Sequence, residues 1–164
     1  MEYSFATRDG LDEIYSNIIN APQIPSSVTD MEGTFSGCSN LINVPEILSS
    51  ATSMKHTFSG CSSLTKAPAI PISVTDMYGT FSACSSLIEA PVIPSSVTNM
   101  YGTFFGCTSL TGTVQINSSI LSNMNSCFHN ITNSLTVKVP KNSTTCTTIT
   151  GQYGSSSNVT IETF

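Results

Sequence analysis

Residues 73–87 read S-V-T-D-M-Y-G-T-F-S-A-C-S-S-L, and close copies of this stretch recur along the chain at a constant spacing. A step of 23 residues from Met77 reaches Met54 in one direction and Met100 in the other. The same step gives columns of like residues: Met31, Met54, Met77 and Met100; Thr34, Thr57, Thr80 and Thr103; Phe35, Phe58, Phe81 and Phe104; Cys38, Cys61, Cys84 and Cys107; Leu41, Leu64, Leu87 and Leu110; Pro22, Pro45, Pro68 and Pro91. A unit this short cannot bury its own apolar face, so such units stack and share one core. The repeat therefore predicts a stacked array with the phenylalanine, cysteine and leucine columns inside.

The repeat also marks the limits of the array. Four good copies cover residues 21–43, 44–66, 67–89 and 90–112, and a degenerate fifth copy with one inserted residue continues to residue 135. We predict one structural domain in three parts: an N-terminal cap at residues 1–20, the array at 21–135 and a C-terminal cap at 136–164. Distinct end units are typical of stacked repeats, because the terminal faces of the core must be covered.

Local patterns predict short elements within each unit. Residues 64–70 favour a strand, although Pro68 removes one ladder donor. A corner at Pro71 and Ser73 precedes a second extended piece at 74–77, and residues 79–86 favour a 3₁₀ turn or one helical turn. In the caps we predict an amphipathic helix at 9–20, strands at 135–139 and 159–164, a short helix at 146–153 and a turn at 154–157.

Charge argues against several classes of function. The chain has 164 residues, a net charge of −5 and only five Lys and Arg residues, which are scattered. Binding to nucleic-acid phosphates or anionic lipid requires a basic patch, so neither is expected. No apolar run approaches the ~20 residues of a membrane helix, so no membrane insertion is expected. Residues 1–10 lack the apolar region of a secretory signal, which leaves two expectations: a protein not exported by that route, or a piece of a longer chain.

The unit at residues 73–87 resembles the BspA-like leucine-rich repeats of bacterial and protist surface proteins. Those repeats carry V-T-x-M/I and an aromatic residue, then F-x-x-C-x-x-L. The resemblance covers roughly residues 21–135, and the closing L-T-V-K-V-P and N-V-T-I-E-T-F segments are similar to the C-terminal caps of such arrays. It implies a leucine-rich-repeat solenoid, mainly β with short 3₁₀ or helical turns, in about five 23-residue coils with an N-terminal helical cap and a C-terminal β cap. It also implies an adhesin or interaction module, and similar arrays occur on phage tail proteins.

The cysteines suit the core better than chemistry. Stacked coils would place the cysteine column with Cα atoms ~5 Å apart but with parallel Cα–Cβ vectors, which disfavour disulfides. We therefore expect buried free thiols that act as small apolar groups. Cys127 and Cys146 lie off the column, and a disulfide between them that staples the cap is an alternative. No C-x₂-C cluster is present, so we expect no metal site and no cofactor.

Catalysis is poorly supported. His56 occupies a slot that holds glycine in other units, which indicates a surface position. His129 could pair with Cys127, but no orienting acid accompanies them, so we do not expect an enzyme. Asp30 and Asp76 share one position with Ser53 and Asn99, and we interpret it as a turn position whose side chain hydrogen-bonds its own backbone.

Recognition is expected at positions that vary while the frame stays constant. Three positions of the unit vary: after the methionine, before the alanine column, and between proline and isoleucine. The residues are Glu32, Lys55, Tyr78 and Tyr101; Asn43, Lys66 and Glu89; and Gln23, Glu46, Ala69 and Val92. Tyr78 and Tyr101 should stack on adjacent coils and suit contact with protein or sugar. The alternative is that these exposed positions vary without function.

These observations predict a non-catalytic recognition or adhesion module that binds a protein or glycan on a host or bacterial cell surface. The alternatives are a phage tail or receptor-binding module for a bacterial surface, and a structural spacer within a larger protein. The expected location is extracellular, on the cell surface or on a virion.

Overall fold

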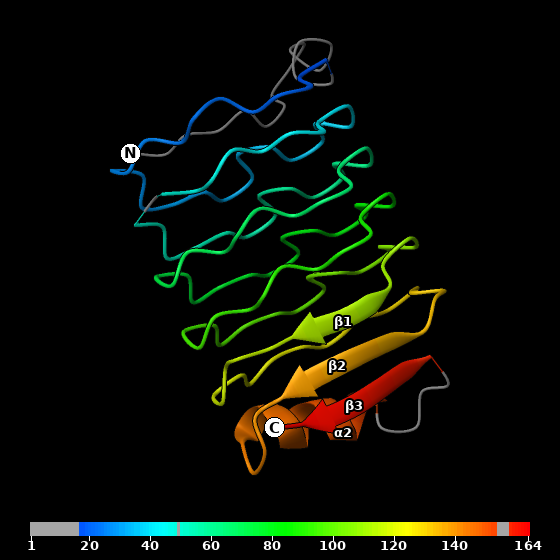
Figure 1. The fold of residues 1–164 in the computed structure, drawn as a ribbon. Helices are drawn as coiled ribbons and strands as arrows, with labels where there is room; N and C mark the ends of the chain where they lie inside the picture. Colours follow the sequence, from blue (N-terminus) through cyan, green and yellow to red (C-terminus); the bar gives the residue numbers. More distant parts are fainter. Residues whose placement is uncertain (1–16, 49, 154–157) are drawn as a thin grey trace.

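The structure, a computed structural model, describes residues 17–48, 50–153 and 158–164. Figure 1 shows successive segments of the chain stacked as coils, from the blue N-terminal end to the red C-terminal end. Isolated parallel bridges join equivalent residues of neighbouring coils, and one series runs Asp30–Ser53, Ser53–Asp76, Asp76–Asn99. Each of these bridges spans 23 residues, so the period of the sequence is the period of the stack.

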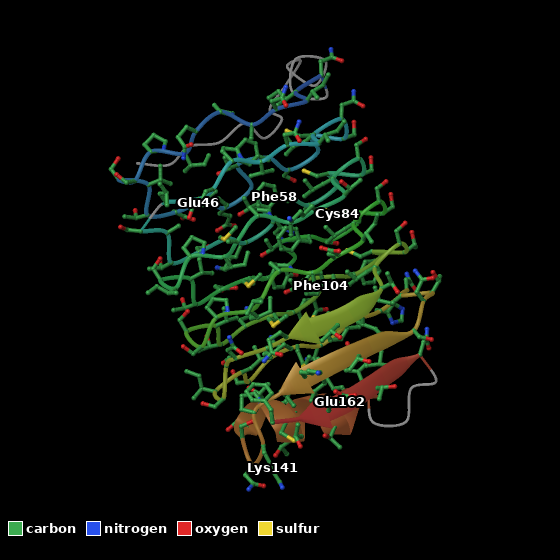
Figure 2. All side chains as sticks on the ribbon, viewed as in Figure 1. Glu46, Phe58, Cys84, Phe104, Lys141 and Glu162 are labelled. Atoms are coloured by element: carbon green, nitrogen blue, oxygen red, sulfur yellow. The ribbon has the colours of Figure 1, made fainter. Side chains whose placement is uncertain are left out.

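The interior consists of the repeated apolar columns. The rings of Phe35, Phe58, Phe81 and Phe104 stack nearly parallel, with neighbouring centroids 5.5, 5.5 and 5.7 Å apart, and Phe128 extends the ladder at 5.9 Å. Also completely buried are the sulfur and leucine columns: Cys38, Cys61, Cys84 and Cys107; Leu41, Leu64, Leu87 and Leu110. Figure 2 shows Phe58, Cys84 and Phe104 within the stack and Glu46 at its edge.

Polar members of the core are paired between coils. The Thr80 hydroxyl donates to the Met54 carbonyl of the preceding coil at 2.9 Å, and the Cys84 thiol donates to the Phe58 carbonyl at 3.0 Å. Thr57, Thr103, Cys61 and Cys107 repeat these bonds in their own coils. Within the described part of the chain, no buried side-chain nitrogen or oxygen lacks a partner. Threonine is therefore tolerated in the core because each hydroxyl meets a carbonyl.

The segment after each methionine uses its amides alternately. In the third coil, the N–H groups of Met77, Gly79, Phe81 and Ala83 donate to carbonyls of the next coil, while those of Thr80, Ser82 and Cys84 donate to carbonyls three residues back. The three-residue bonds are those of the predicted 3₁₀ turn, but no continuous 3₁₀ helix forms. Gly79, with φ 60°, and Ala83, with φ 59°, have left-handed backbone, and the N–H groups of both donate to the next coil.

The predicted strand at 64–70 is wrong. This segment makes only one isolated bridge, between Lys66 and Glu89. Proline at position 68 has no N–H to donate, and Pro91 repeats this gap in the neighbouring coil, so a regular ladder cannot extend through the segment. The coils are consequently joined by single bridges and turn hydrogen bonds rather than by long strands.

Regular strands occur at the C-terminal end. Strands β1 (Gly112–Gln115), β2 (Leu135–Val139) and β3 (Val159–Thr163) form a parallel sheet in the order β1-β2-β3. The predictions at 135–139 and 159–164 are thus confirmed to within one residue, whereas β1 was not predicted. Helix α2 (Thr144–Tyr153) begins two residues before its predicted start, because Ser143 caps it by accepting the Cys146 N–H at 3.0 Å.

The fifth coil absorbs its extra residue before the methionine. Asn99 pairs with Asn123, 24 residues away, so Cys127 falls in the threonine column rather than the cysteine column. At the N-terminal end, residues 17–20 are not helical, so the helix predicted at 9–20 is wrong over its last four residues, where Asn20 instead bridges Asn43. The rest of the predicted helix, up to residue 16, and the turn predicted at 154–157 lie outside the described residues.

Candidate aromatic binding cleft

Asx turns hold Glu32, Tyr78 and Tyr101, which each follow a methionine of the repeat, and Ser53 accepts the Lys55 N–H in the same way at 3.4 Å. Asp76 Oδ1 accepts the Tyr78 N–H at 3.0 Å, and Asn99 Oδ1 accepts the Tyr101 N–H at 3.1 Å. Asp30 does the same for the Glu32 N–H at 2.9 Å, which confirms the predicted role of this position. The turn fixes the backbone of the tyrosines, so their rings start from equivalent points in adjacent coils.

The two tyrosine rings stack on the surface. The Tyr78 and Tyr101 centroids are 5.0 Å apart with an interplanar angle of 9°. His56, from the preceding coil, meets Tyr78 edge to face at 4.8 Å and 77°. Aromatic pairs in these geometries gain roughly 0.5–1.5 kcal/mol beyond burial, so the three rings form an ordered cluster.

Glycine makes room for this cluster. A methyl group on Gly79 would lie 2.6 Å from both Cε1 and Nδ1 of His56, so the imidazole packs directly over the Gly79 backbone. Gly102 occupies the same position one coil later and, like Gly79, has positive φ. Side chains at these two positions would fill the surface beside the tyrosines.

A shallow cavity of about 170 Å³ lies among these rings. We call it the aromatic cleft, and its lining is His56, Tyr78, Gly79, Ser82, Tyr101, Gly102, Phe105 and Ser126. Phe105 is 38% exposed and stacks on His129 with centroids 5.5 Å apart. The lining contains no carboxylate, ammonium or guanidinium group, so the cleft suits a neutral ligand.

The remaining post-methionine residues do not join this cleft. Glu32 is exposed two coils away, and Lys55 is half-buried with its ammonium 3.6 Å from Asp76 Oδ2. This ion pair engages Lys55 beside the cluster instead of leaving it to a ligand. The residues that follow the methionines therefore differ in role: Glu32 is an exposed acid, Lys55 forms an ion pair, and Tyr78 and Tyr101 line the cleft.

The other variable positions lie along a second face, which we call the proline groove. It consists of two hollows, of about 370 and 470 Å³, that share Lys66, Ala67, Pro68 and Ala69. Glu89 and Val92 line the first hollow, and Asn43 and Glu46 line the second. Two side chains here already have partners, since Asn43 Nδ2 donates to Asn20 Oδ1 at 2.7 Å and Gln23 Nε2 donates to the Glu46 carbonyl at 3.0 Å. None of the cavities found among the described residues combines this groove with the aromatic cleft.

Two aromatic residues of this face were missed as binding residues. The sequence pattern indicated only a surface position for His56. It assigned no role to Phe105, which follows the ladder residue Phe104. The signal was available in the sequence, since Phe105 stands where the three preceding coils have Ser36, Ser59 and Ser82. A large residue in an otherwise constant column of small residues indicates a position that the packing of the repeat does not determine.

The thiols are protected rather than reactive. All six cysteines are free, and five are buried, while Cys146 is half-buried. The alternative disulfide between Cys127 and Cys146 is therefore absent. Burial raises the pKa of the Cys107 thiol to about 12, and it also raises the pKa of Cys61, Cys84 and Cys127. A thiol held in its protonated form is a poor nucleophile.

The side chains of the conceivable Cys127–His129 pair lie in different environments. Cys127 is buried in the threonine column, whereas His129 is exposed and stacks on Phe105. Among residues 17–48, 50–153 and 158–164, no group of three or more His, Cys, Asp or Glu side chains is placed to hold a metal ion. In the same residues, no helix is both long and apolar enough to cross a membrane.

Comparison with protein families agrees with the repeat geometry. The family model described as BspA type leucine-rich repeat region matches the chain in six copies, over residues 10–135 and 55–162. The chain therefore belongs to the BspA-type leucine-rich-repeat family, which confirms the resemblance based on residues 73–87. No curated protein and no solved structure matches the chain.

Proposed function

We propose that this protein is a non-catalytic, surface-exposed recognition module, in which a solenoid of leucine-rich repeats presents the aromatic cleft to a protein ligand on a cell surface. The observation that carries the proposal is the ordered cluster of partly exposed rings, with Tyr78 and Tyr101 stacked at 5.0 Å beside an open cavity. Tyrosine is enriched among residues that dominate binding energy, because it offers a large rigid surface with a polar end.

Several properties support binding over turnover. The buried thiols keep their protons, and the His129 imidazole stacks on Phe105, so the structure supports no activated cysteine nucleophile. Membership of a family named for its repeats agrees with a frame that displays side chains. A location outside the cell, on a cell surface or on a virion belongs to the same proposal.

The test measures binding of labelled protein to bacterial cells, mammalian cells and immobilised matrix proteins. We expect selective binding that the double variant Tyr78→Ala/Tyr101→Ala weakens by about tenfold or more. The matched control is Glu32→Ala, which changes the same column outside the cleft and should bind like the unmodified protein.

Each outcome selects a function. Binding to mammalian cells or matrix would favour an adhesin, and binding to particular bacteria would favour a phage-type receptor-binding module. If the double variant binds as tightly as the unmodified protein, the aromatic cleft is not the binding site. Failure to bind any surface in the panel would contradict the recognition proposal and favour a structural spacer.

A further inference from the structure

One column of the stack changes from serine to aromatic residues beside the cleft. Ser36, Ser59 and Ser82 occupy it in the first three coils, and Phe105 and His129 occupy it in the next two. Phe105 stacks on His129 with an interplanar angle of 14°, so one face of its ring is covered. Phe105 remains 38% exposed and lines the cavity together with Ser82 of the preceding coil, whose short side chain leaves space beside the ring.

The space beside Phe105 lies where a regular aromatic column would place one more ring. In every aromatic column of this stack, rings on neighbouring coils lie 5.0–5.9 Å apart, which is the spacing that one aromatic ring per coil produces. At the height of Ser82 the ring is absent, and Ser82, Phe105 and Tyr78 together line the cavity. His56 and Gly79 bound the same space from the preceding coil and from its own coil.

We propose that the aromatic cleft receives a planar aromatic side chain from a partner polypeptide, which enters at the height of Ser82 and stacks on the free face of Phe105. This inference rests on the proposed recognition function and names the ligand chemistry of its site. The inserted ring continues the Phe105–His129 stack and contacts the edge of Tyr78.

The lining favours a side chain of a protein over a sugar or a charged group. Lys55, which precedes His56, and Asp76, which lies two residues before Tyr78, pair with each other at 3.6 Å, and neither lines the cleft. Tyrosine, serine and glycine make up most of the lining, and this is the composition of the protein-binding loops of antibodies. Ring stacking on a preformed face also costs little ordering of the site, since Phe105 is already held by His129.

The experiment titrates N-acetyltryptophanamide into the protein and follows the imidazole proton resonances by NMR. The chain contains two histidines: His56 lines the cleft, and His129 stacks on the lining residue Phe105, so the His56 signals report on the cleft directly and the His129 signals through Phe105. We expect saturable shifts of the His56 signals, from the ring current of the bound indole, and smaller shifts of the His129 signals.

Three variants locate the binding. Ser82→Phe fills the slot with the chain's own ring and should weaken probe binding by about tenfold. Phe105→Ser restores the residue of the preceding three coils and should weaken it similarly. Ser36→Phe makes the same change two coils away from Ser82 and should leave binding unchanged. Thermal unfolding of each variant verifies that it is folded.

The outcomes separate this inference from the proposed function. If Ser82→Phe and Phe105→Ser bind the probe like the unmodified protein, insertion on Phe105 is wrong. If chitooligosaccharides or other glycans shift the histidine signals and N-acetyltryptophanamide neither shifts them nor competes, the ligand is a sugar and the inference is overturned. If cell binding depends on Tyr78 and Tyr101 while the probe has no effect, recognition stands and the aromatic-side-chain proposal fails.

Discussion

At the scale of single residues, left-handed backbone recurs once per coil just before the cysteine column. Gly37, Gly60, Ala83, Gly106 and Asn130 all have positive φ, from 59° to 79°. The position releases its N–H toward the next coil, as Ala83 does toward the Phe105 carbonyl at 2.7 Å. An L-residue with a Cβ is strained there by roughly 1–2 kcal/mol in the left-handed region. Alanine in the third coil is therefore a local weakness of the frame.

We predict that Ala83→Gly stabilises the protein by about 0.5–1 kcal/mol, because relief of the left-handed strain exceeds the added freedom of glycine in the unfolded chain. Urea denaturation monitored by circular dichroism measures the change. The reciprocal variant Gly106→Ala should lose about 1 kcal/mol from φ alone, since its new Cβ would lie 3.8 Å from the nearest atom, Ala83 Cα. Destabilisation by Ala83→Gly, or stabilisation by Gly106→Ala, would contradict the left-handed backbone at these positions.

At the scale of elements, helix α2 closes the C-terminal end of the core. Ile149 is completely buried, and the Leu121 N–H donates to Thr145 Oγ1 at 2.9 Å. The Tyr153 hydroxyl accepts the Phe128 N–H at 3.2 Å and donates to the Met124 carbonyl at 3.4 Å. Helix residues thus satisfy amides and a carbonyl of the fifth coil that have no sixth coil to meet in the described structure.

We predict that Ser143→Ala destabilises the protein by about 1 kcal/mol, because the Cys146 N–H loses its capping oxygen at the start of α2. A lower thermal midpoint would report the loss. Ser143→Asp offers another capping oxygen and should retain most of the stability. Equal destabilisation by both variants would show that another contact of Ser143, such as its bond to the Pro140 carbonyl, matters more.

At the scale of the whole molecule, the cysteine column makes stability dependent on alkaline pH. The buried thiols have raised pKa values, so the folded protein keeps their protons while the unfolded chain releases them above the ordinary cysteine value of 9.0. Their contribution is complete below that value and is lost progressively as the pH rises toward about 12, the raised pKa of Cys107.

We predict that the free energy of unfolding falls above pH ~9 by about 1.4 kcal/mol per pH unit for each buried thiol that the unfolded chain ionises. Urea titrations between neutral and alkaline pH measure the slope. Cys84→Ser keeps a donor for the Phe58 carbonyl but removes one titrating group, so its slope should be shallower. An unchanged slope would contradict the role of Cys84.

Under native conditions, a thiol reagent should modify Cys146 fastest, since it is the half-buried cysteine.

The sequence by itself determined the period, the columns and the Asx turns. When units stack, residues at a 23-residue spacing have equivalent neighbours, so all the residues of one column share the same environment. The aspartate and asparagine side chains act within two residues of themselves, which makes their role a local property. For the same reason strands β2 and β3, with clear local alternation, could be predicted.

Only the tertiary structure decided which variable positions share a surface. The sequence treats Tyr78 and Lys66 alike, as variable sites in one unit, yet they lie on different faces because the coil turns between them. The aromatic cleft also depends on contacts between coils, because His56 packs over Gly79 and Phe105 stacks on His129. The failed strand at 64–70 has the same origin, since pairing depends on two facing coils and Pro68 and Pro91 remove donors from both. Local patterns specify what each coil contains, and side chains that cross between coils specify what the surface can bind.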